Sequence, residues 1–358
     1  MSFTADDHRF MAEALRLAEK GRLTVDPNPA VGCLIVSDGE VVGRGWHRAA
    51  GEPHAETLAL QQAGAGARGA TAYVTLEPCS HHGRTPPCAQ GLIEAGVAAV
   101  VSAMPDPDAR VAGRGHEMLA RAGVTVRTGL MEAAASALNR GFVSRHERGR
   151  PWVRVKLAAS LDGLTAGTDG RSQWITGESA RADVQQWRAR ASCILTGIGT
   201  VLADDPRLNV RLSGFDRQVL RLVVDSRARL PDGLRLTTLP GPLVVATCGE
   251  PRAIDGVEWW QLPADLSGRV SLPSLMARLA EREVNTVHVE AGPTLAGALV
   301  ASGLVDELLV YQAPCLIGRG RPLLELPGME KFDDRLHLEL IDERRLGPDH
   351  RFIYRLAS

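Results

Sequence analysis

The segments His54-Ala55-Glu56 and Pro78-Cys79-Ser80-His81-His82-Gly83-Arg84-Thr85-Pro86-Pro87-Cys88 decide what the first half of this chain can be. Together they offer one imidazole, from His54, and two thiolates, from Cys79 and Cys88. A zinc ion with three protein ligands keeps its fourth position for water, as catalytic sites require and structural sites do not. Glu56 lies two residues after the histidine, where its carboxylate can move protons to and from that water. The segments therefore predict a catalytic zinc site, with metal ligands His54, Cys79 and Cys88 and with Glu56 as proton shuttle.

The spacing of the two cysteines sets a condition on this site. The pattern H-x-E…P-C-x-x-C is typical of zinc-dependent base deaminases, but here a loop of eight residues separates Cys79 from Cys88. Tetrahedral geometry survives the longer loop if Cys79 ends a strand and Cys88 opens the following helix. The alternative is two unrelated cysteines and a histidine that caps a helix. Because residues 72–77 have strand character and residues 89–95 have helix character, we favour the zinc site.

The elements around these segments indicate an α/β domain. Apolar residues recur every three to four positions in residues 4–20, which predicts a helix that begins with a Thr4–Asp7 capping box. Asp38-Gly39 favours a hairpin between strands 31–36 and 41–46. Strands that alternate with helices predict a sheet with helices on both faces. Further strands are expected at 72–77, 97–103 and 124–128, and helices at 54–62, 89–95, 115–122 and 132–146.

Length and composition limit the classes of function. A chain of 358 residues is expected to form two domains, because single cores seldom exceed ~250–300 residues. The net charge of −1 and the aromatic content of 4% provide neither a basic field nor a stacking surface for nucleic acid. No apolar run approaches the ~20 residues that span a bilayer, and no signal peptide is visible. Six cysteines in so long a chain are not a disulfide framework, which predicts a reduced, cytoplasmic protein.

A polar segment that ends in proline, residues 145–151, is the predicted linker between a domain at 1–147 and a domain at 151–358. The second domain is also expected to be α/β. Its strands are predicted at 152–159, 192–196, 219–224, 243–247, 257–261, 286–289 and 307–312, and its helices at 179–189, 272–283 and after residue 292. Residues 337–344 and 349–356 predict a terminal hairpin.

Two glycine-containing segments of the second domain indicate where a phosphate could bind. Gly197-Ile198-Gly199-Thr200 follows a predicted strand and is either a phosphate-binding turn or an ordinary one. Glu290-Ala291-Gly292-Pro293-Thr294 ends a strand and starts a helix, whose N-terminus favours anions. Arg188 and Arg211 are each either phosphate ligands or surface charges. Glu290 either caps the helix or binds substrate; as a substrate group, its replacement by glutamine should spare the melting temperature.

The longer motifs resemble one family over nearly the whole chain. The first domain is similar to that family in Pro27-Asn-Pro-x-Val-Gly32, Gly51-Glu-Pro-His-Ala-Glu56 and the segment from Thr75 to Cys88. The second is similar in Lys156-Leu-x-x-Ser-Leu-Asp-Gly163, Ser172-Gln-Trp-Ile-Thr176, Thr200-Val-Leu-Ala-Asp-Asp-Pro206, Val224-Asp-Ser226 and Glu290-Ala-Gly-Pro-Thr-Leu-Ala-Gly297. The chain thus resembles the bifunctional deaminase–reductases of riboflavin biosynthesis (RibD), whose zinc motif has the same eight-residue loop. The resemblance implies a cytidine-deaminase-like three-layer α/β domain followed by a dihydrofolate-reductase-like α/β domain.

The resemblance also implies two reactions on small pyrimidine ribosyl phosphates, with no nucleic-acid or membrane partner. With Zn²⁺, the first domain would deaminate 2,5-diamino-6-ribosylamino-4(3H)-pyrimidinone 5′-phosphate. With NADPH, the second would reduce the ribosyl group of 5-amino-6-(5-phosphoribosylamino)uracil to ribityl. A homo-oligomer is expected. The alternatives are a zinc deaminase for another nucleobase or nucleotide with a nucleotide-binding second domain, a nucleic-acid base editor, and a non-catalytic zinc module.

Matching motifs assign roles to individual residues. Asn28, His81 and Arg84 would contact the first substrate. NADPH would be lined by Ala158, Trp174, Thr200, Asp204, Ser226, Gly292, Pro293, Thr294, Leu295, Ala296, Gly297 and Ala298. The ribosyl phosphate substrate of the reductase would be held by Ser172, Arg188, Leu208, Arg211 and Glu290.

Overall fold

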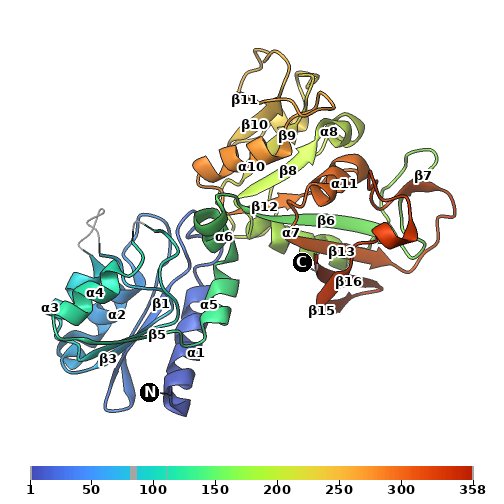
Figure 1. The fold of residues 1–358 in the computed structure, drawn as a ribbon. Helices are drawn as coiled ribbons and strands as arrows, with labels where there is room; N and C mark the ends of the chain where they lie inside the picture. Colours follow the sequence, from blue (N-terminus) through green and yellow to red (C-terminus); the bar gives the residue numbers. More distant parts are fainter. Residues whose placement is uncertain (1, 81–86, 110, 357–358) are drawn as a thin grey trace. The chain divides into compact units, whose positions relative to one another are not determined.

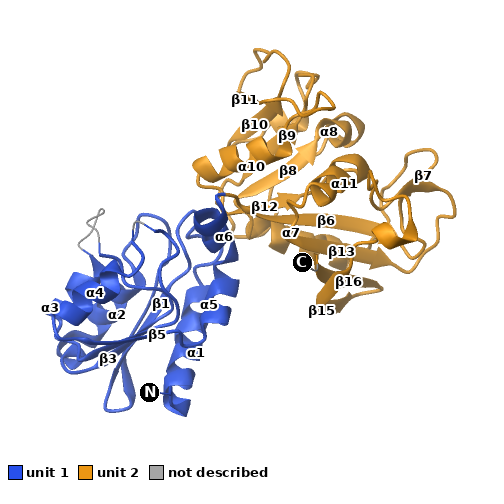
Figure 2. Ribbon diagram, viewed as in Figure 1, with its two compact units in different colours: residues 1–149 blue, residues 150–358 orange. Residues whose placement is uncertain are grey.

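The chain consists of two compact units, residues 1–149 and residues 150–358 (Figures 1 and 2). The computed structural model describes residues 2–80, 87–109 and 111–356. The units divide after α6 (Arg140–Arg148), which ends at Gly149 with a φ of 64°, a conformation that favours glycine. The predicted linker 145–151 is therefore wrong in its extent, because its first four residues belong to α6. Their basic side chains stabilise the C-terminal end of the helix dipole.

Unit 1 is built on a five-stranded sheet in the order β2-β1-β3-β4-β5. β1 (Gly32–Ser37) pairs antiparallel with β2 (Glu40–Trp46) and with β3 (Thr71–Val74). In contrast, β3, β4 (Ala99–Ser102) and β5 (Thr125–Thr128) are parallel. The predicted hairpin is confirmed, and Asp38 and Gly39 at its turn both have positive φ. Because β3 and β4 are parallel, their carboxyl ends meet at one edge of the sheet.

Helices cover both faces of this sheet, as the alternation of strands and helices predicts. Along β1, Cys33 and Ile35 pack in one apolar cluster and Leu34 and Val36 in another, because successive side chains of a strand point to opposite faces. The first cluster includes α2 (Ala55–Ala63), α3 (Cys88–Glu94) and α4 (Arg114–Arg121). The second includes α1 (Ala5–Glu19) and α5 (Glu132–Leu138). Unit 1 thus has three layers, with a short 3₁₀ helix, η1 (Gly64–Ala67), after α2.

The single helix predicted for residues 132–146 is wrong, because the chain forms α5 and α6 with a break at Asn139. The side-chain amide of Asn139 accepts a hydrogen bond from the N–H of Ala30 at 2.8 Å and donates one to its C=O at 3.0 Å. Both backbone groups of a buried residue are satisfied in this way. The tertiary contact therefore explains the break, which the local sequence pattern does not show.

Unit 2 is built on a nine-stranded sheet in the order β11-β10-β9-β8-β12-β6-β13-β16-β15. All neighbours from β11 to β13 are parallel, whereas β16 is antiparallel to both β13 and β15. The predicted terminal hairpin is thereby confirmed. The strands are β6 (Trp152–Ser160), β8 (Cys193–Gly197), β9 (Leu220–Val224), β10 (Leu243–Thr247), β11 (Glu258–Gln261), β12 (Thr286–Val289), β13 (Glu307–Ala313), β15 (Leu338–Leu346) and β16 (Asp349–Leu356).

Helices also cover both faces of the sheet of unit 2 (Figure 1). α10 (Leu272–Glu281) and α11 (Pro293–Ala301) pack on the face that contains Leu222. α8 (Ile198–Asp204) and α9 (Arg235–Thr238) pack on the face of its neighbour Val223. α7 (Glu178–Ala189) packs against β13 and β16 through Trp187. β7 (Leu164–Gly167) and β14 (Gly320–Pro322) form a separate ribbon, and the 3₁₀ helix η2 (Phe332–Asp334) precedes β15.

Candidate active sites

The three predicted zinc ligands come together from separate elements of unit 1. His54 is the N-cap of α2, and Cys88 is the first residue of α3, which confirms the expectation that it opens a helix. The expectation that Cys79 ends a strand is wrong, because β3 already ends at Val74. After β3, the chain is held at the end of the sheet by contacts with β1 and with the start of α4. Thr75 accepts a hydrogen bond from the N–H of Gly32, and Glu77 accepts one from the N–H of Gly115.

The donor atoms of these residues fit a zinc ion. The imidazole nitrogen and the two sulfurs all lie within 4.8 Å of one another. His54 Nδ1 is 3.2 Å from Cys88 Sγ and 3.7 Å from Cys79 Sγ. Tetrahedral zinc, with bonds of ~2.3 Å to sulfur and ~2.0 Å to nitrogen, would hold such donors about 3.5 Å apart. One nitrogen and two sulfurs are also the donor types that zinc prefers, and three ligands leave one position for water.

Hydrogen bonds favour the thiolate form of Cys79. Its sulfur accepts a hydrogen bond from the backbone N–H of Cys88 at 3.3 Å. The Cys88 thiol and the His54 ring also bond to it, and together they hold the pKa of the Cys79 thiol well below its ordinary value. Because the thiolate is the form that binds metals, these contacts prepare Cys79 to act as a ligand.

Glu56 lies in the first turn of α2 and is only 4% exposed. Burial, and then the negative charge of Cys79, raise the pKa of Glu56 to about 7. A carboxyl group with a pKa near neutrality can accept a proton and return it. Both the position and the acidity of Glu56 therefore suit the proton shuttle that the sequence predicts.

A second histidine, His47, lies against the metal donors and was missed in the sequence. Its ring is edge-on to that of His54, with 5.3 Å between the centroids. His47 Nδ1 is 3.2 Å from the C=O of Pro53, which can only accept, so Nδ1 carries the proton. Nε2 then accepts a hydrogen bond from the Asn28 side chain at 3.1 Å. Burial lowers the pKa of His47, so the ring is neutral at pH 7.

Asn28 is therefore connected to the donor His54 through one side chain, that of His47. His81 and Arg84, the other two residues expected to contact the first substrate, lie outside the described residues. The sequence signal for His47 was weak: a single histidine shortly after a predicted strand, between two motifs.

In unit 2, two predicted substrate residues bind each other. Arg188 lies in the last turn of α7, and Glu290 follows the end of β12. The guanidinium donates through Nε and Nη2 to the two oxygens of Glu290, at 2.5 and 2.8 Å. Its Nη1 donates to the C=O of Asn209 at 2.8 Å. Residues 102 positions apart thus form one bidentate ion pair.

The ion pair with Arg188 determines the protonation state of Glu290. The N-cap of α11 is Gly292, so Glu290 does not cap that helix. Against the effect of burial, the charge of Arg188 and its hydrogen bonds hold the pKa of Glu290 well below its ordinary value. Glu290 is therefore an ionised acceptor.

Two more ionisable side chains border the pair, and neither was predicted. His288 Nε2 is 3.3 Å from Glu290 Oε1, and burial lowers the pKa of this fully buried ring. Lys156 lies on the neighbouring strand β6; burial lowers its pKa, and its ammonium interacts with the charges of Glu290 and Arg188. In the sequence, the only sign of a role for His288 and Lys156 is that each is a polar residue inside an otherwise apolar strand.

The other predicted substrate residues differ in what they can offer a ligand. The backbone N–H of Arg211 donates to Gln185, and its guanidinium donates to the Asn209 side chain. Arg211 thus lies on the same loop as Asn209, whose C=O accepts a hydrogen bond from Arg188. Leu208 has a side chain that is 2% exposed within an apolar cluster, so a ligand would meet its backbone. Ser172 is half-buried in the segment before α7.

Most of the predicted cofactor residues gather at the carboxyl ends of adjacent strands, where α/β sheets bind ligands. β9, β8 and β12 are neighbours in the sheet. Ser226 follows β9, Thr200 and Asp204 lie in α8 after β8, and residues 292–298 follow β12. The turn expected at Gly197–Thr200 is instead the start of α8, with Gly197 as N-cap.

The predicted cofactor residues differ in how far a ligand could reach them. Gly292, Pro293 and Thr294 form the N-cap and first turn of α11. In contrast, Ala296 is fully buried, and a Cβ on Gly297 would lie 1.7 Å from the C=O of Glu325. These two residues therefore pack within unit 2. Leu295 and Ala298 continue α11, Ala158 lies in β6, and Trp174 is 70% exposed with Arg181 over its ring.

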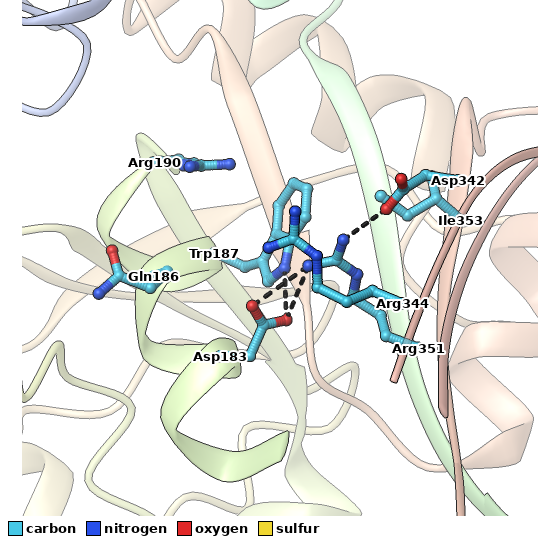
Figure 3. Close-up of a pocket in the computed structure, with 8 residues that line it drawn as sticks. All are labelled: Asp183, Gln186, Trp187, Arg190, Asp342, Arg344, Arg351 and Ile353. Atoms are coloured by element: carbon cyan, nitrogen blue, oxygen red, sulfur yellow. Dashed lines mark hydrogen bonds and ion pairs between the residues drawn. The ribbon is translucent and has the colours of Figure 1, made fainter. Parts of the chain in front are cut away.

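A polar network anchors another side of α7 (Figure 3). Asp183 accepts hydrogen bonds from Trp187 Nε1 at 3.0 Å, Tyr311 Oη at 2.7 Å and Arg351 Nη1 at 3.1 Å. Tyr311 belongs to β13 and Arg351 to β16, so Asp183 joins α7 to both strands. These bonds help to fix the orientation of α7, which carries Arg188 towards Glu290. The network borders a cavity of about 380 Å³ lined by Asp183, Gln186, Trp187, Arg190, Asp342, Arg344, Arg351 and Ile353.

Two family models match this chain. The model described as "RibD C-terminal domain" covers residues 151–352, and "Cytidine and deoxycytidylate deaminase zinc-binding region" covers residues 4–104. The Escherichia coli (K12) riboflavin biosynthesis protein RibD is 50% identical, over 96% of this chain and 97% of its own length. The chain belongs to the RibD family. The Haemophilus influenzae RibD is 45% identical, over 99% of this chain and 98% of its own length.

Solved RibD structures have the same fold. Acinetobacter baumannii RibD, form 1, superposes with a TM-score of 0.92 at 41% identity, covering 99% of both chains. A Thermotoga maritima structure superposes with a TM-score of 0.90 at 31% identity, covering 98% of this chain and 99% of its own. The expected family and the expected fold class, a deaminase-like α/β domain followed by a reductase domain, are thereby confirmed.

Membership of the RibD family defines the class of activity. The chain is a bifunctional enzyme of riboflavin biosynthesis, with a hydrolytic deaminase domain and a reductase domain. Its cofactors are zinc, for which unit 1 offers the three donors, and NADPH. In the described part of the chain, no helix combines the length and apolar character needed to cross a bilayer.

Proposed function

We propose that this RibD deaminates 2,5-diamino-6-ribosylamino-4(3H)-pyrimidinone 5′-phosphate and then reduces the ribosyl group of 5-amino-6-(5-phosphoribosylamino)uracil to ribityl. The Thermotoga relative carries the name diaminohydroxyphosphoribosylaminopyrimidine deaminase/5-amino-6-(5-phosphoribosylamino)uracil reductase. The observation that carries the proposal is the triangle of His54, Cys79 and Cys88 with buried Glu56 beside it.

In the deaminase, His54, Cys79 and Cys88 would hold zinc, which when bound supplies a Lewis acid that makes water a nucleophile near neutral pH. Glu56 would carry the first proton of that water to the ring nitrogen. It would carry the second, from the hydroxyl left on the ring carbon, to the amine, which departs as ammonia and leaves a carbonyl. A pKa of about 7 suits both directions of transfer. Asn28, held by neutral His47, would contact the pyrimidine, together with His81 and Arg84.

In the reductase, NADPH supplies hydride, and the protein's task is to position substrate and cofactor. Because Glu290 is ionised and paired with Arg188, it would accept a hydrogen bond from a sugar hydroxyl. The substrate would be held by Ser172, Arg188, Leu208, Arg211 and Glu290. The cofactor would be lined by Ala158, Trp174, Thr200, Asp204, Ser226 and Gly292–Ala298.

The proposal extends to the organisation of the protein. Residues 1–147 would form the deaminase domain and residues 151–358 the reductase domain, in a cytoplasmic homo-oligomer. Support for self-association comes from β15, an edge strand of nine residues. Leu338, Leu340 and Ile341 on this strand are 44%, 50% and 38% exposed, and burial of such a row against a second copy would be favourable.

One coupled assay tests the two reactions. Purified protein is given the diaminopyrimidine phosphate, ammonia release is measured, and NADPH is then added and its consumption followed. We expect ammonia first, and NADPH consumption only after deamination. Ammonia released from a cytosine or adenine nucleotide, but not from the diaminopyrimidine phosphate, would instead identify a deaminase for another nucleobase.

A further inference from the structure

Glu77 is a buried carboxylate two residues before Cys79, and no step described above uses it. Its side chain is fully buried. Oε1 accepts hydrogen bonds from the backbone N–H groups of Gly115 at 2.9 Å and His116 at 3.3 Å. Oε2 accepts them from Gly113 at 2.9 Å and Asp106 at 3.2 Å. One carboxylate thus binds four backbone donors, which lie 29 to 39 positions further along the chain.

These donors come from the loop after β4 and from the start of α4. The N-cap of α4 is Gly113. The first N–H groups of α4 point at the Glu77 carboxylate, and the dipole of this helix favours a negative charge at its N-terminus. The backbone N–H of Glu77 also donates to the C=O of Met104 at 3.0 Å, just after β4. Both the main chain and the side chain of Glu77 are therefore fixed to residues 104–106 and 113–116. We call these contacts the Glu77 clamp.

The clamp is close to Cys79 along the chain and in space. Only Pro78 separates the two residues, and the proline ring restricts the backbone at that point. A Cβ on Gly115 would lie 1.9 Å from the C=O of Pro78, so the loop and Pro78 are in direct contact. A displacement of the clamp would therefore move Cys79.

Cys79 needs such support more than the other two zinc donors do. His54 and Cys88 sit at the starts of α2 and α3, so helices hold them. Cys79 lies in neither a helix nor a strand. Its own contacts are to the His54 ring, to Cys88 and to the N–H of Ala89. From the side of β3, the position of Cys79 depends on residues 75–78.

We infer that Glu77 is a positioning residue for zinc: its clamp holds Cys79 where the sulfur completes the donor set with His54 and Cys88. The inference rests on the proposed role of Cys79 as a zinc ligand. A carboxylate is needed because two oxygens, with their lone pairs, must accept four hydrogen bonds. Glutamine has the same size, but its NH₂ group would face two N–H donors and leave them unpaired.

The test compares zinc binding with folding in the full-length protein. Zinc affinity and the rate of zinc release are measured by competition with a chromogenic chelator, at a temperature where every variant is folded by circular dichroism. For Glu77→Gln we expect about ten-fold weaker zinc binding, or more, as for other residues that orient metal ligands. Glu77→Asp, which keeps the charge but shortens the reach, should fall between Glu77→Gln and wild type.

Tyr73→Phe is the matched control, because Tyr73 is also buried and lies on β3, four residues before Glu77. It loses one hydrogen bond, to Asp7, in the apolar cluster on the other face of the sheet. This variant should lower the melting temperature and keep wild-type zinc affinity. Gly115→Ala gives a second test that keeps the Glu77 side chain: its Cβ would push the C=O of Pro78 and crowd Glu77 Oε1, so it should weaken zinc binding.

The outcomes separate the clamp from the zinc site itself. Zinc affinity of Glu77→Gln equal to that of Tyr73→Phe would overturn the inference and leave Glu77 as an ordinary stabilising residue. Wild-type zinc affinity in Gly115→Ala would overturn the link through Pro78. If Glu77→Gln does not fold, Glu77→Asp decides in its place. A wild-type protein that binds no zinc would instead refute the role of Cys79.

Discussion

The two candidate sites of this RibD are assembled in different ways. In unit 1, the outermost metal donors, His54 and Cys88, are 34 positions apart, and a shared ion would join them. In unit 2, Arg188 and Glu290 are 102 positions apart and bind each other directly. The deaminase site is thus a local motif whose residues indicate their own chemistry. The reductase site depends on which strands and helices become neighbours, so its residues acquire their partners only in the fold.

The largest expected effect tests the local site. Glu56→Gln should lower the rate of ammonia release by ~10²–10⁴-fold, the usual contribution of a general acid–base group. Zinc content should stay at the wild-type level, because Glu56 is not one of the three donors. NADPH-dependent reduction of the deaminated substrate is the internal control and should not change. Near-normal deamination, or loss of zinc, would contradict the role of Glu56.

The next effect tests the long-range pair. From sequence alone, Glu290→Gln should reduce turnover and spare the melting temperature; the ion pair changes this expectation. Arg188 and Glu290 have side chains only 10% and 16% exposed, so removal of one charge leaves the other buried and uncompensated. We expect a loss of about 3–5 kcal/mol in the stability of unit 2, together with slower reduction.

A double variant, Arg188→Gln with Glu290→Gln, is the control for this prediction. It removes both charges, so it should recover part of the stability lost in the single variant, as measured by thermal unfolding. An unchanged melting temperature in Glu290→Gln would show that the pair does not form in solution.

A smaller effect concerns the boundary between the units. Arg150 donates two hydrogen bonds of 2.8 Å to Asp306 and one to the C=O of Leu304. Fragment 150–358 should therefore be more stable than fragment 151–358, by about 1–3 kcal/mol. Chemical denaturation would measure this difference in stability. Both fragments should also bind NADPH, which a cofactor titration would test. If both fragments are insoluble, the reductase unit does not fold alone.

The smallest effect is a dependence of stability on pH. Burial lowers the pKa of His288 below its ordinary value of 6.5, so below pH 6.5 the unfolded chain binds a proton that the folded chain does not. Stability should then fall on acidification, by up to about 1.4 kcal/mol per pH unit. The pKa of Glu290 lies below 4.5, so its own contribution changes at lower pH. His288→Asn should reduce this slope below pH 6.5; an equal slope in both proteins would exclude His288 as a source of it.

Sequence reasoning placed local neighbours together and missed distant partners. The proximity of His54, Glu56 and Cys88 was predictable because ligand types, spacing and a helix start coincide. The course of the chain around Cys79 was not, because the partners of Glu77 lie at least 29 positions later. The helix breaks at Asn139 because the side chain of this residue binds the backbone of Ala30, 109 positions away. Periodicity finds single elements, whereas such contacts are set by the packing of elements against one another.

The same distinction holds for the sheet of unit 2. Its strands were predicted one by one, but nothing in a strand's own residues says which strands lie beside it. Lys156 and Arg188 were therefore visible as charges and not as neighbours of Glu290. The pairing of β6 with β12 and β13 brings them together.

The place of β6 in that sheet has a consequence for the newly made protein. β6 is the first strand of unit 2 to leave the ribosome, but its partners β12 and β13 begin only at Thr286 and Glu307. At synthesis rates of about 5–20 residues per second, the wait lasts on the order of ten seconds. Unit 1 contains all of its strands by Thr128 and can fold during that time. Until then, the strand Trp152–Ser160 lacks its native partners, and such unpaired strands are where a nascent chain is exposed to aggregation.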